Sequence, residues 1–231
     1  MKTHITKALF LLVLLSFMSF ASSARQKKQL HAPTFAKGGD ISWLPQMEAS
    51  GYKFLNDKGV AEDCFKILKD HGMNSIRLRT WVNPSNDKGS GHCSKEETVA
   101  MAVRAKKYGM RVMINFHYSD TWADPAKQAK PKAWVGLNFE QLKQALYNYT
   151  FDVMTALKTA GVTPEWVQVG NETPSGMIYP EGSTDNWPQL AQLINKGPLM
   201  NSVIEVMTPR DACQSLALSI RIKQFVGVTN R

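Results

Sequence analysis

Residues 98–116 read TVAMAVRAKKYGMRVMINF and contain the structural unit from which the fold is predicted. The first part has helical periodicity, and Ser94 and Glu97 ahead of it form a capping box that would satisfy free amides at a helix start. Gly109 suits the left-handed position just past a helix. The apolar run at 111–116 then has strand character. The stretch therefore predicts a helix, a glycine and a strand in succession.

The same order of elements recurs along the chain. Apolar runs with strand character occupy residues 38–41, 75–79, 111–116 and 166–170. Segments with helical periodicity lie between or after them, at residues 60–71, 98–108, 139–160 and 187–196. Three of these helices end at a glycine that leads into the next strand, namely Gly72, Gly109 and Gly161. Because each helix returns the chain to the same edge, the strands are predicted to be parallel.

Two α/β architectures have this order, an open doubly wound sheet and a (β/α)8 barrel. No glycine-rich phosphate-binding loop follows any predicted strand, and the loops are long and aromatic, as at the C-terminal face of a barrel. We therefore predict the (β/α)8 TIM-barrel family. A complete barrel needs ~250 residues, so only about the first four βα units are expected. Four such units form an open parallel sheet, so we expect its last strand to have an unpaired edge. Residues 203–207 could form one further strand.

The first 24 residues differ in composition from the rest. Lys2 and Lys7 precede an apolar run at 8–21, which ends in small residues. The run is short for a membrane-spanning helix and has the size of a secretory signal peptide, with an uncleaved anchor as the alternative. We expect a mature protein that is secreted, periplasmic or at the cell surface. The expected organisation is a signal peptide at 1–24, a short linker at 25–34, the N-terminal half of a barrel at 35–197 and a non-matching tail at 198–231.

Composition and charge narrow the function classes. The chain has 231 residues, 43% hydrophobic and 20% charged, with a formal net charge of +9. This composition is globular and excludes a disordered or fibrous protein. The positive charge could favour nucleic acid or pectin-rich wall material, but the lysines are scattered, so a solvated surface is the preferred interpretation. We expect no nucleic-acid partner, and no membrane partner after signal cleavage.

The three cysteines indicate no metal site. Cys64, Cys93 and Cys213 lack the spacing of zinc or iron–sulfur ligands. In an oxidising compartment one pair could form a disulfide, and nothing in the sequence selects which.

An Asn-Glu pair follows the fourth predicted strand. Gly170 would let the backbone leave the barrel rim, so that Asn171 and Glu172 project over its mouth. Desolvation among aromatic side chains would raise the pKa of Glu172, which could then protonate a leaving oxygen. The Asn171 amide could bond a sugar 2-hydroxyl. The alternative is an Asx turn with a solvated glutamate, and the position after a barrel strand favours catalysis.

Further polar and aromatic residues lie at the ends of strands. Arg77 and Arg79 fall on the same side of their strand, where an arginine could orient a carboxylate. His117 follows the third strand and is either a site residue or a core histidine. Four tryptophans follow strands, namely Trp81, Trp122, Trp134 and Trp187. Four indoles on one rim favour a saccharide cleft over packing, and we assign Trp122 and Trp134 to its platform.

The motifs taken together, in order, resemble the endo-β-1,4-galactanases of glycoside hydrolase family 53. They lie at residues 40–42, 76–82, 115–125, 127–128, 131–134 and 167–172. The resemblance covers about residues 35–197. It implies a secreted arabinogalactan endo-β-1,4-galactanase, an endo-acting, retaining glycosidase whose substrate is the galactan of type I arabinogalactan.

The resemblance also implies roles for single residues. Glu172 matches the general acid/base, and Asn171 is its hydrogen-bonding neighbour. Arg77, His117 and Asp120 match the polar floor of the cleft. The predicted substrate-binding residues are Asn171, Arg77, His117, Asp120, Trp122 and Trp134.

The resemblance implies no cofactor in this part of the chain. The calcium-binding loop of some family members lies in the other half of the barrel, as does the nucleophile, a glutamate at the end of strand seven. Glu205 and Asp211 lie in no matching motif, so this chain is expected to lack the nucleophile. The alternatives are another retaining glycosidase, such as a mannanase or β-glucanase, and a non-catalytic truncated product.

Overall fold

The computed structural model describes residues 35–87, 91–196, 204–206 and 219–222. The chain divides into two compact units, Met1–Phe35 and Ala36–Arg231, and the elements below belong to the second. The predicted signal peptide and linker, Cys213 and most of the predicted tail lie outside the described residues. In the described part of the chain, no helix is long and apolar enough to cross a membrane.

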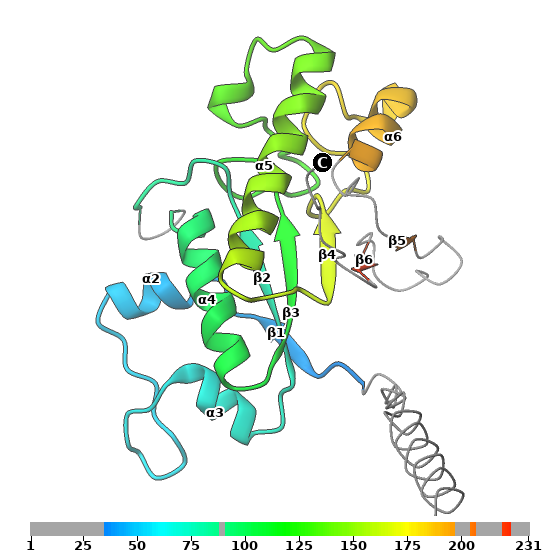
Figure 1. Cartoon of the computed structure of the whole chain (residues 1–231). Coiled ribbons are helices and arrows are strands. Elements are labelled where there is room, and N and C mark those ends of the chain that lie inside the picture. The colour runs from blue at the N-terminus through cyan, green and yellow to red at the C-terminus, as the bar shows by residue number, and fades with distance from the viewer. Residues whose placement is uncertain (1–34, 88–90, 197–203, 207–218, 223–231) are drawn as a thin grey trace, which may run out of the picture. The chain divides into compact units, whose positions relative to one another are not determined.

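The described strands form one sheet (Figure 1). They are β1 (Gly38–Asp40), β2 (Ser75–Thr80), β3 (Arg111–Phe116), β4 (Trp166–Val169), β5 (Ile204–Val206) and β6 (Ser219–Ile222). Their spatial order is β1-β2-β3-β4-β6-β5. The first four strands pair in parallel, with Asp40 opposite Arg77 and Ile114 opposite Val167. The predicted parallel arrangement is therefore confirmed.

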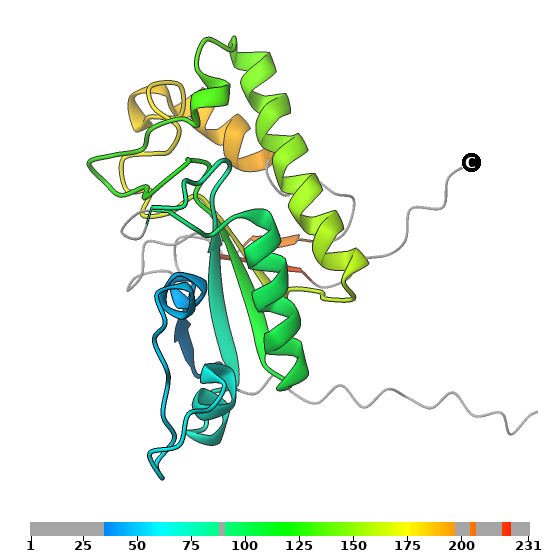
Figure 2. The same ribbon diagram turned by 90° about the vertical axis from the view of Figure 1, so that its left-hand side faces the viewer.

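Helices follow each of the first four strands, and two of them, instead of the one predicted, lie between β1 and β2. They are α2 (Leu44–Ala49), α3 (Cys64–Asp70), α4 (Lys95–Lys107), α5 (Phe139–Thr159) and α6 (Trp187–Lys196), with short 3-10 turns η1 (Lys132–Trp134) and η2 (Thr184–Asn186). Figures 1 and 2 show α4 and α5 side by side along one face of the sheet. Helix α4 packs on β2 and β3, and α6 packs against α5.

Local sequence signals explain where the helices begin. Ser94 caps α4, and Asn138 caps α5, each in a reciprocal capping box. Helix α3 is shorter than the predicted helix at 60–71. It starts after Asp63, whose carboxylate accepts a hydrogen bond from the amide of Phe65, and this cap ends the extended segment that precedes it.

The two faces of the sheet differ in polarity. Ile76, Leu78 and Ile114 are buried in the hydrophobic core, together with apolar residues of α4 and α5. The alternate positions carry polar side chains, including Arg77 and Asn115. Because side chains alternate across a strand, the same residues that build the core also place polar groups together on the opposite face.

The structure corrects one expectation about the edge of β4. A row of four parallel strands would leave β4 with an unpaired edge, and we expected such an edge from the sequence. Instead, β6 pairs antiparallel with β4, with Val167 opposite Ile220, and β5 pairs with β6. An antiparallel strand can satisfy the backbone groups of an edge without being part of a βα unit. The strand predicted at 203–207 is confirmed as β5.

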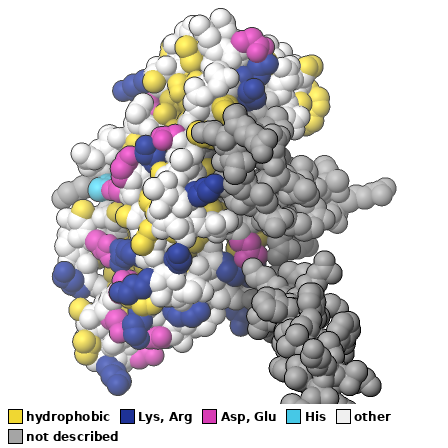
Figure 3. All heavy atoms as spheres, in the orientation of Figure 1, with side chains coloured by type: hydrophobic (Ala, Val, Ile, Leu, Met, Phe, Trp, Pro, Cys, Tyr) yellow, Lys and Arg dark blue, Asp and Glu magenta, His cyan; other side chains and the backbone are white. Residues whose placement is uncertain are grey.

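Charged side chains of both signs are interspersed on the surface. Figure 3 shows Lys and Arg side chains mixed with Asp and Glu over the face in view. Several are ion-paired, such as Arg104 with Glu48, at 2.8 Å, and Lys66 with Asp70, at 2.6 Å. The face in view thus has the scattered charge that the sequence predicted.

Candidate active site

Arg77 lies at the centre of a polar network on the sheet face opposite the helices. Its Nε donates to Gln168 Oε1, at 3.0 Å, and its Nη1 is hydrogen-bonded to the carboxylate of Asp40. Its Nη2 donates to Asn115 Oδ1 and to Asn171 Oδ1, each at 2.7 Å. One guanidinium therefore ties together side chains from β1, β3, β4 and the loop after β4. Asp40 was not among the predicted site residues, although it lies in a quoted motif.

The side-chain amide of Asn171 is held from two directions. Its Oδ1 accepts the bond from Arg77, and its Nδ2 donates to the carbonyl of Ala123, at 2.7 Å. The side chain is buried. These bonds assign the amide oxygen and nitrogen without ambiguity, because a flipped amide would place like groups together.

Glu172 has an unusual backbone conformation next to this amide. Its φ is +46°, and the preceding Gly170 has a φ of +79°. The Glu172 side chain is exposed. In the described part of the chain, its carboxylate has no hydrogen-bond or ion-pair partner. The expected desolvation by aromatic neighbours is therefore not found among the described residues, where the Glu172 side chain is exposed.

Gly170 provides a matched test of this turn. An added Cβ at Gly170 would lie 2.7 Å from Thr173 Cγ2 and 2.9 Å from Met177 Sδ, whereas at Gly136, with a φ of +84°, it would meet no described atom within 4 Å. Both Gly170→Ala and Gly136→Ala should cost ~1–2 kcal/mol for the left-handed backbone. Gly170→Ala should cost a further ~1–3 kcal/mol for overpacking. Urea unfolding measures the difference, and equal losses in the two variants would contradict the crowded turn.

His117 is buried beneath two indole rings. It is 1% exposed, and its ring centroid lies 5.9 Å from that of Trp81 and 6.1 Å from that of Trp122. Burial lowers the pKa of His117 to about 3, with further lowering by the positive charges of Arg77 and Arg79. Its Nδ1 accepts the amide of Ala123, at 3.3 Å, so the neutral ring carries its hydrogen on Nε2. Among the described residues, Nε2 has no partner.

The lowered pKa makes His117 a source of pH-dependent stability. The unfolded residue takes up a proton near pH 6.5, whereas the folded residue does so only near pH 3. Its contribution to the free energy of unfolding is therefore fully present above pH 6.5 and is lost as the pH falls toward 3, by about 1.4 kcal/mol per pH unit. Urea unfolding at a series of pH values should show a shallower loss for His117→Asn. The control is His71→Asn, at an exposed histidine, and matching slopes for wild type and His117→Asn would refute the assignment.

The four tryptophans do not form one rim. Trp122 is 43% exposed, and the guanidinium carbon of Arg79 lies 4.1 Å from its ring centroid. Trp134 is 6% exposed and packs in the core beside Tyr118 and Tyr149. The prediction that Trp134 belongs to a saccharide platform is therefore wrong, because η1 turns its indole toward α5.

The other two indoles also differ from each other. Trp81 is buried beneath Trp122, in edge-to-face contact with it. Trp187 is 62% exposed and is the first residue of α6. Of the two tryptophans that we assigned to the platform, Trp122 is the one that remains available to a ligand.

Asp120 connects two loops through backbone hydrogen bonds. Its Oδ1 accepts the amide of Asn83, at 2.9 Å, and its Oδ2 accepts the amide of Lys132, at 2.8 Å. The carboxylate thus joins the loop after β2 to the start of η1. Each oxygen keeps a second lone pair, so these bonds leave the predicted role of Asp120 in the floor of the cleft as a prediction.

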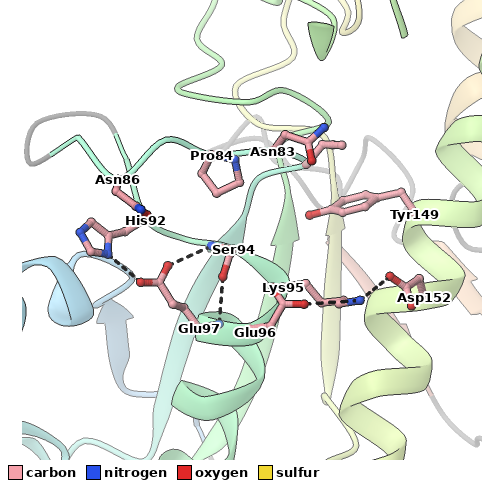
Figure 4. Close-up of a pocket in the computed structure, with 11 residues that line it drawn as sticks. Asn83, Pro84, Asn86, His92, Ser94, Lys95, Glu96, Glu97, Tyr149 and Asp152 are labelled. Atoms are coloured by element: carbon pink, nitrogen blue, oxygen red, sulfur yellow. Dashed lines mark hydrogen bonds and ion pairs between the residues drawn. The ribbon is translucent and has the colours of Figure 1, made fainter. Parts of the chain in front are cut away.

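Two hollows lie near this region. A polar cavity of about 600 Å³ lies at the start of α4, with the capping residues Ser94 and Glu97 in its wall (Figure 4). His92 Nδ1 lies 2.6 Å from Glu97 Oε1, and Lys95 Nζ lies 2.8 Å from Asp152 Oδ2. A smaller hollow of about 250 Å³ lies on the polar sheet face, lined by Gly38, Asp40, Arg77, Met113 and Trp166 among others.

The described residues offer no metal centre and no disulfide. No group of three or more His, Cys, Asp or Glu side chains among them could hold a metal ion. Cys64 and Cys93 are both free and buried. Burial raises the pKa of both thiols, that of Cys93 to about 11, so neither is a thiolate at neutral pH.

Comparison with known proteins identifies relatives of the chain. The family model described as glycosyl hydrolase family 53 matches residues 36–211, a range that passes Gly197, where the resemblance was predicted to end. An endo-beta-1,4-galactanase of Bacillus subtilis is 43% identical over 167 residues, covering 71% of this chain and 38% of that protein. An arabinogalactan endo-beta-1,4-galactanase of Thermothelomyces thermophilus is 40% identical over 159 residues, covering 69% and 46%.

The solved structures that resemble this chain belong to the same family. The GH53 catalytic domain of Ignisphaera aggregans superposes with a TM-score of 0.67 at 38% identity, covering 73% of this chain and 48% of that domain. A fungal beta-1,4-galactanase superposes with a TM-score of 0.66 at 40% identity, covering 72% and 48%. The chain thus spans less than half the length of each of these four relatives.

Proposed function

Because the chain belongs to glycosyl hydrolase family 53, we propose that it is the N-terminal part of the catalytic domain of an exported endo-β-1,4-galactanase. Its fold class is the (β/α)8 barrel, of which β1 to β4 are four strands. The observation that carries the proposal is the network in which Arg77 orients Asn171 beside Glu172. The network fixes the Asn171 amide just after β4, and Glu172 is the next residue, at the edge where such a barrel keeps its catalytic groups.

Glu172 is the proton donor of the proposed reaction. Its carboxyl group protonates the glycosidic oxygen as the bond to the leaving galactan chain breaks, and its carboxylate then removes a proton from water. Asn171 Nδ2 has a second hydrogen besides the one given to Ala123. We assign that hydrogen to the 2-hydroxyl of the sugar, where the bond would strengthen in the transition state.

The nucleophile is assigned to no described residue. Retaining hydrolysis needs a second carboxylate ~5–5.5 Å from the first. Asp40 belongs to the network, but its carboxylate is bonded to Arg77 and accepts the hydroxyl of Ser42, at 2.6 Å. Because these bonds engage the carboxylate within the network, we give Asp40 the role of supporting Arg77.

Trp122 supplies the proposed saccharide contact. Its exposed indole rests on Arg79, which is itself buried. An aromatic face held in this way suits the apolar face of a pyranose ring. The proposed substrate is the β-1,4-galactan of arabinogalactan.

Polysaccharide assays test the proposed activity. The 231-residue chain is compared with the same chain extended by the corresponding C-terminal half of the Bacillus subtilis relative. Reducing-sugar release is measured on β-1,4-galactan, mannan and β-glucan. We expect the extended chain to cleave galactan alone. The oligosaccharides released should retain the anomeric configuration of the substrate. Cleavage of mannan or β-glucan in place of galactan, or of no substrate by either protein, would reject the proposal.

Export is tested separately. We propose that residues 1–24 are removed as a signal peptide, since Lys2 and Lys7 precede a short apolar run. Expression in a secreting host, followed by N-terminal sequencing of the protein from the medium, is expected to give a mature chain that starts at Arg25. A cell-bound protein that keeps Met1 would contradict export.

A further inference from the structure

Gln128 is buried beneath the loop that follows β4, although it belongs to the segment after β3. Its side chain is 2% exposed. Its Nε2 donates to the backbone oxygen of Asn171, at 2.8 Å, and to that of Glu172, at 3.1 Å. A primary amide has two hydrogens, so one side chain can serve both carbonyls. Both carbonyls lie outside the strands and helices, where such groups need another donor.

The backbone that Gln128 holds is not one that a glutamate adopts readily. Glu172 has a φ of +46°, in the left-handed region that side chains other than glycine disfavour. Such a conformation persists only where surrounding contacts over-determine it. The side chain of Asn171 is fixed by its own two bonds, whereas the Glu172 carboxylate has no described partner. The direction of the carboxylate therefore depends on how its backbone is held.

A second set of contacts attaches the same segment to the far end of the loop. The carbonyl of Gln128 accepts the amide of Tyr179, at 2.8 Å, and Ala129 pairs with Tyr179 in a parallel bridge. Lys130 Nζ lies 2.5 Å from Glu181 Oε1. These contacts join the two loops without touching the Asn171 and Glu172 carbonyls. They can therefore be altered independently of the bonds from the Gln128 side chain.

We propose that Gln128 is a positioning residue whose side-chain amide sets the direction of the Glu172 carboxylate. It acts through the two backbone carbonyls and does not touch the substrate. Its catalytic consequence rests on the proposed function, in which Glu172 is the proton donor. In the described part of the chain, Gln128 Oε1 has no partner, so donation from Nε2 is the polar interaction that the side chain contributes. The isosteric variant Gln128→Glu removes this donation when ionised and nearly preserves the volume.

The first test measures the backbone of Glu172 in the 231-residue chain. The HN–Hα coupling of Glu172 in NMR spectra depends on its φ and detects a change in that angle. The exchange of the Met177 amide, which donates to the carbonyl of Gly182, reports the order of the loop. Gln128→Glu should change the coupling and raise Met177 exchange by ~10-fold or more. Lys130→Met, which removes an ion pair of the same loops, and Gln144→Ala, which removes an amide from α5, should leave the coupling at its wild-type value.

The second test measures catalysis in the extended chain described above. Gln128→Glu should lower kcat by ~10–100-fold, with KM changed less than about twofold, and should move the limb of the pH profile that reports Glu172. Lys130→Met should keep the wild-type pH profile. Loss of exchange protection in β2 and β3 would show that Gln128→Glu has unfolded. In that case Gln128→Met, which is uncharged and has no hydrogen-bond donor in its side chain, is used instead, and the same changes in coupling, kcat and pH profile are expected.

The outcomes distinguish the two proposals. An unchanged Glu172 coupling in Gln128→Glu, or an equal change in Lys130→Met, overturns the positioning role. A changed coupling in Gln128→Glu alone supports it, even where no form of the protein cleaves galactan, and in that case the proposed function fails on its own. If the wild-type chain itself has no exchange protection in β2 and β3, the loop conformation described above is contradicted, and the positioning role of Gln128 is rejected with it.

Discussion

Glu172→Gln is expected to lower kcat for galactan cleavage by ~10²–10⁴-fold, the usual contribution of general acid–base catalysis. The amide is nearly isosteric with the carboxyl group but cannot transfer the proton. The carboxylate has no described partner, so the change should leave the fold and KM close to wild type. Reducing-sugar release from β-1,4-galactan by the extended chain measures the effect.

The matched control is Glu140→Gln. Glu140 is an exposed glutamate in the first turn of α5, away from the Arg77 network. Its substitution makes the same chemical change at the surface of the protein. It should retain wild-type turnover. If Glu172→Gln also retains it, Glu172 is not the proton donor, and the proton must come from another group.

Trp134→Ala is expected to destabilise the protein by ~3–5 kcal/mol, the usual cost of truncating a buried tryptophan. Its indole fills the core between Tyr118 and Tyr149, and the smaller side chain leaves a cavity there. Trp122→Ala removes an indole that is 43% exposed and should cost less than half as much. Urea unfolding at neutral pH measures both changes.

Saccharide binding should reverse the order of the two variants. Trp122→Ala should weaken the binding of galacto-oligosaccharides by ~10-fold or more in calorimetric titrations, since truncation of a central aromatic contact commonly costs more than 1 kcal/mol. Trp134→Ala, measured where it is still folded, should bind nearly as well as wild type. A large loss of stability in Trp122→Ala together with unchanged affinity would return Trp122 to the core.

Gln128 shows what kind of functional residue sequence reasoning misses. It lies in a motif quoted for the family resemblance, yet its sequence neighbours do not indicate a function. A glutamine flanked by alanine and lysine residues is typical of an ordinary surface segment. Its partners, the carbonyls of Asn171 and Glu172, are 43 and 44 positions away. Asp40 was missed for the same reason, as its bond to Arg77 spans 37 positions.

The order of the first four strands and of helices α3 to α6 was predicted from the sequence alone, whereas α2 and β6 were not predicted. The strand at 111–116, the helix at 187–196 and the capping box at Ser94 lie where they were predicted. These features depend on side-chain periodicity and on hydrogen bonds between residues three or four positions apart. Short-range interactions of this kind are present in the sequence as spacing, so they can be read without a structure.

Only the tertiary structure decided which predicted site residues are exposed and what each contacts. Trp122 and Trp134 have the same side chain in similar loops, yet one is open and the other is in the core. Asp120 has both oxygens on backbone amides, and Glu172 is exposed where burial was expected. Burial and hydrogen bonding at these positions are set by elements far away in the chain, such as α5 beside Trp134. Local spacing contains no record of such contacts, because they arise only when the strands and helices pack.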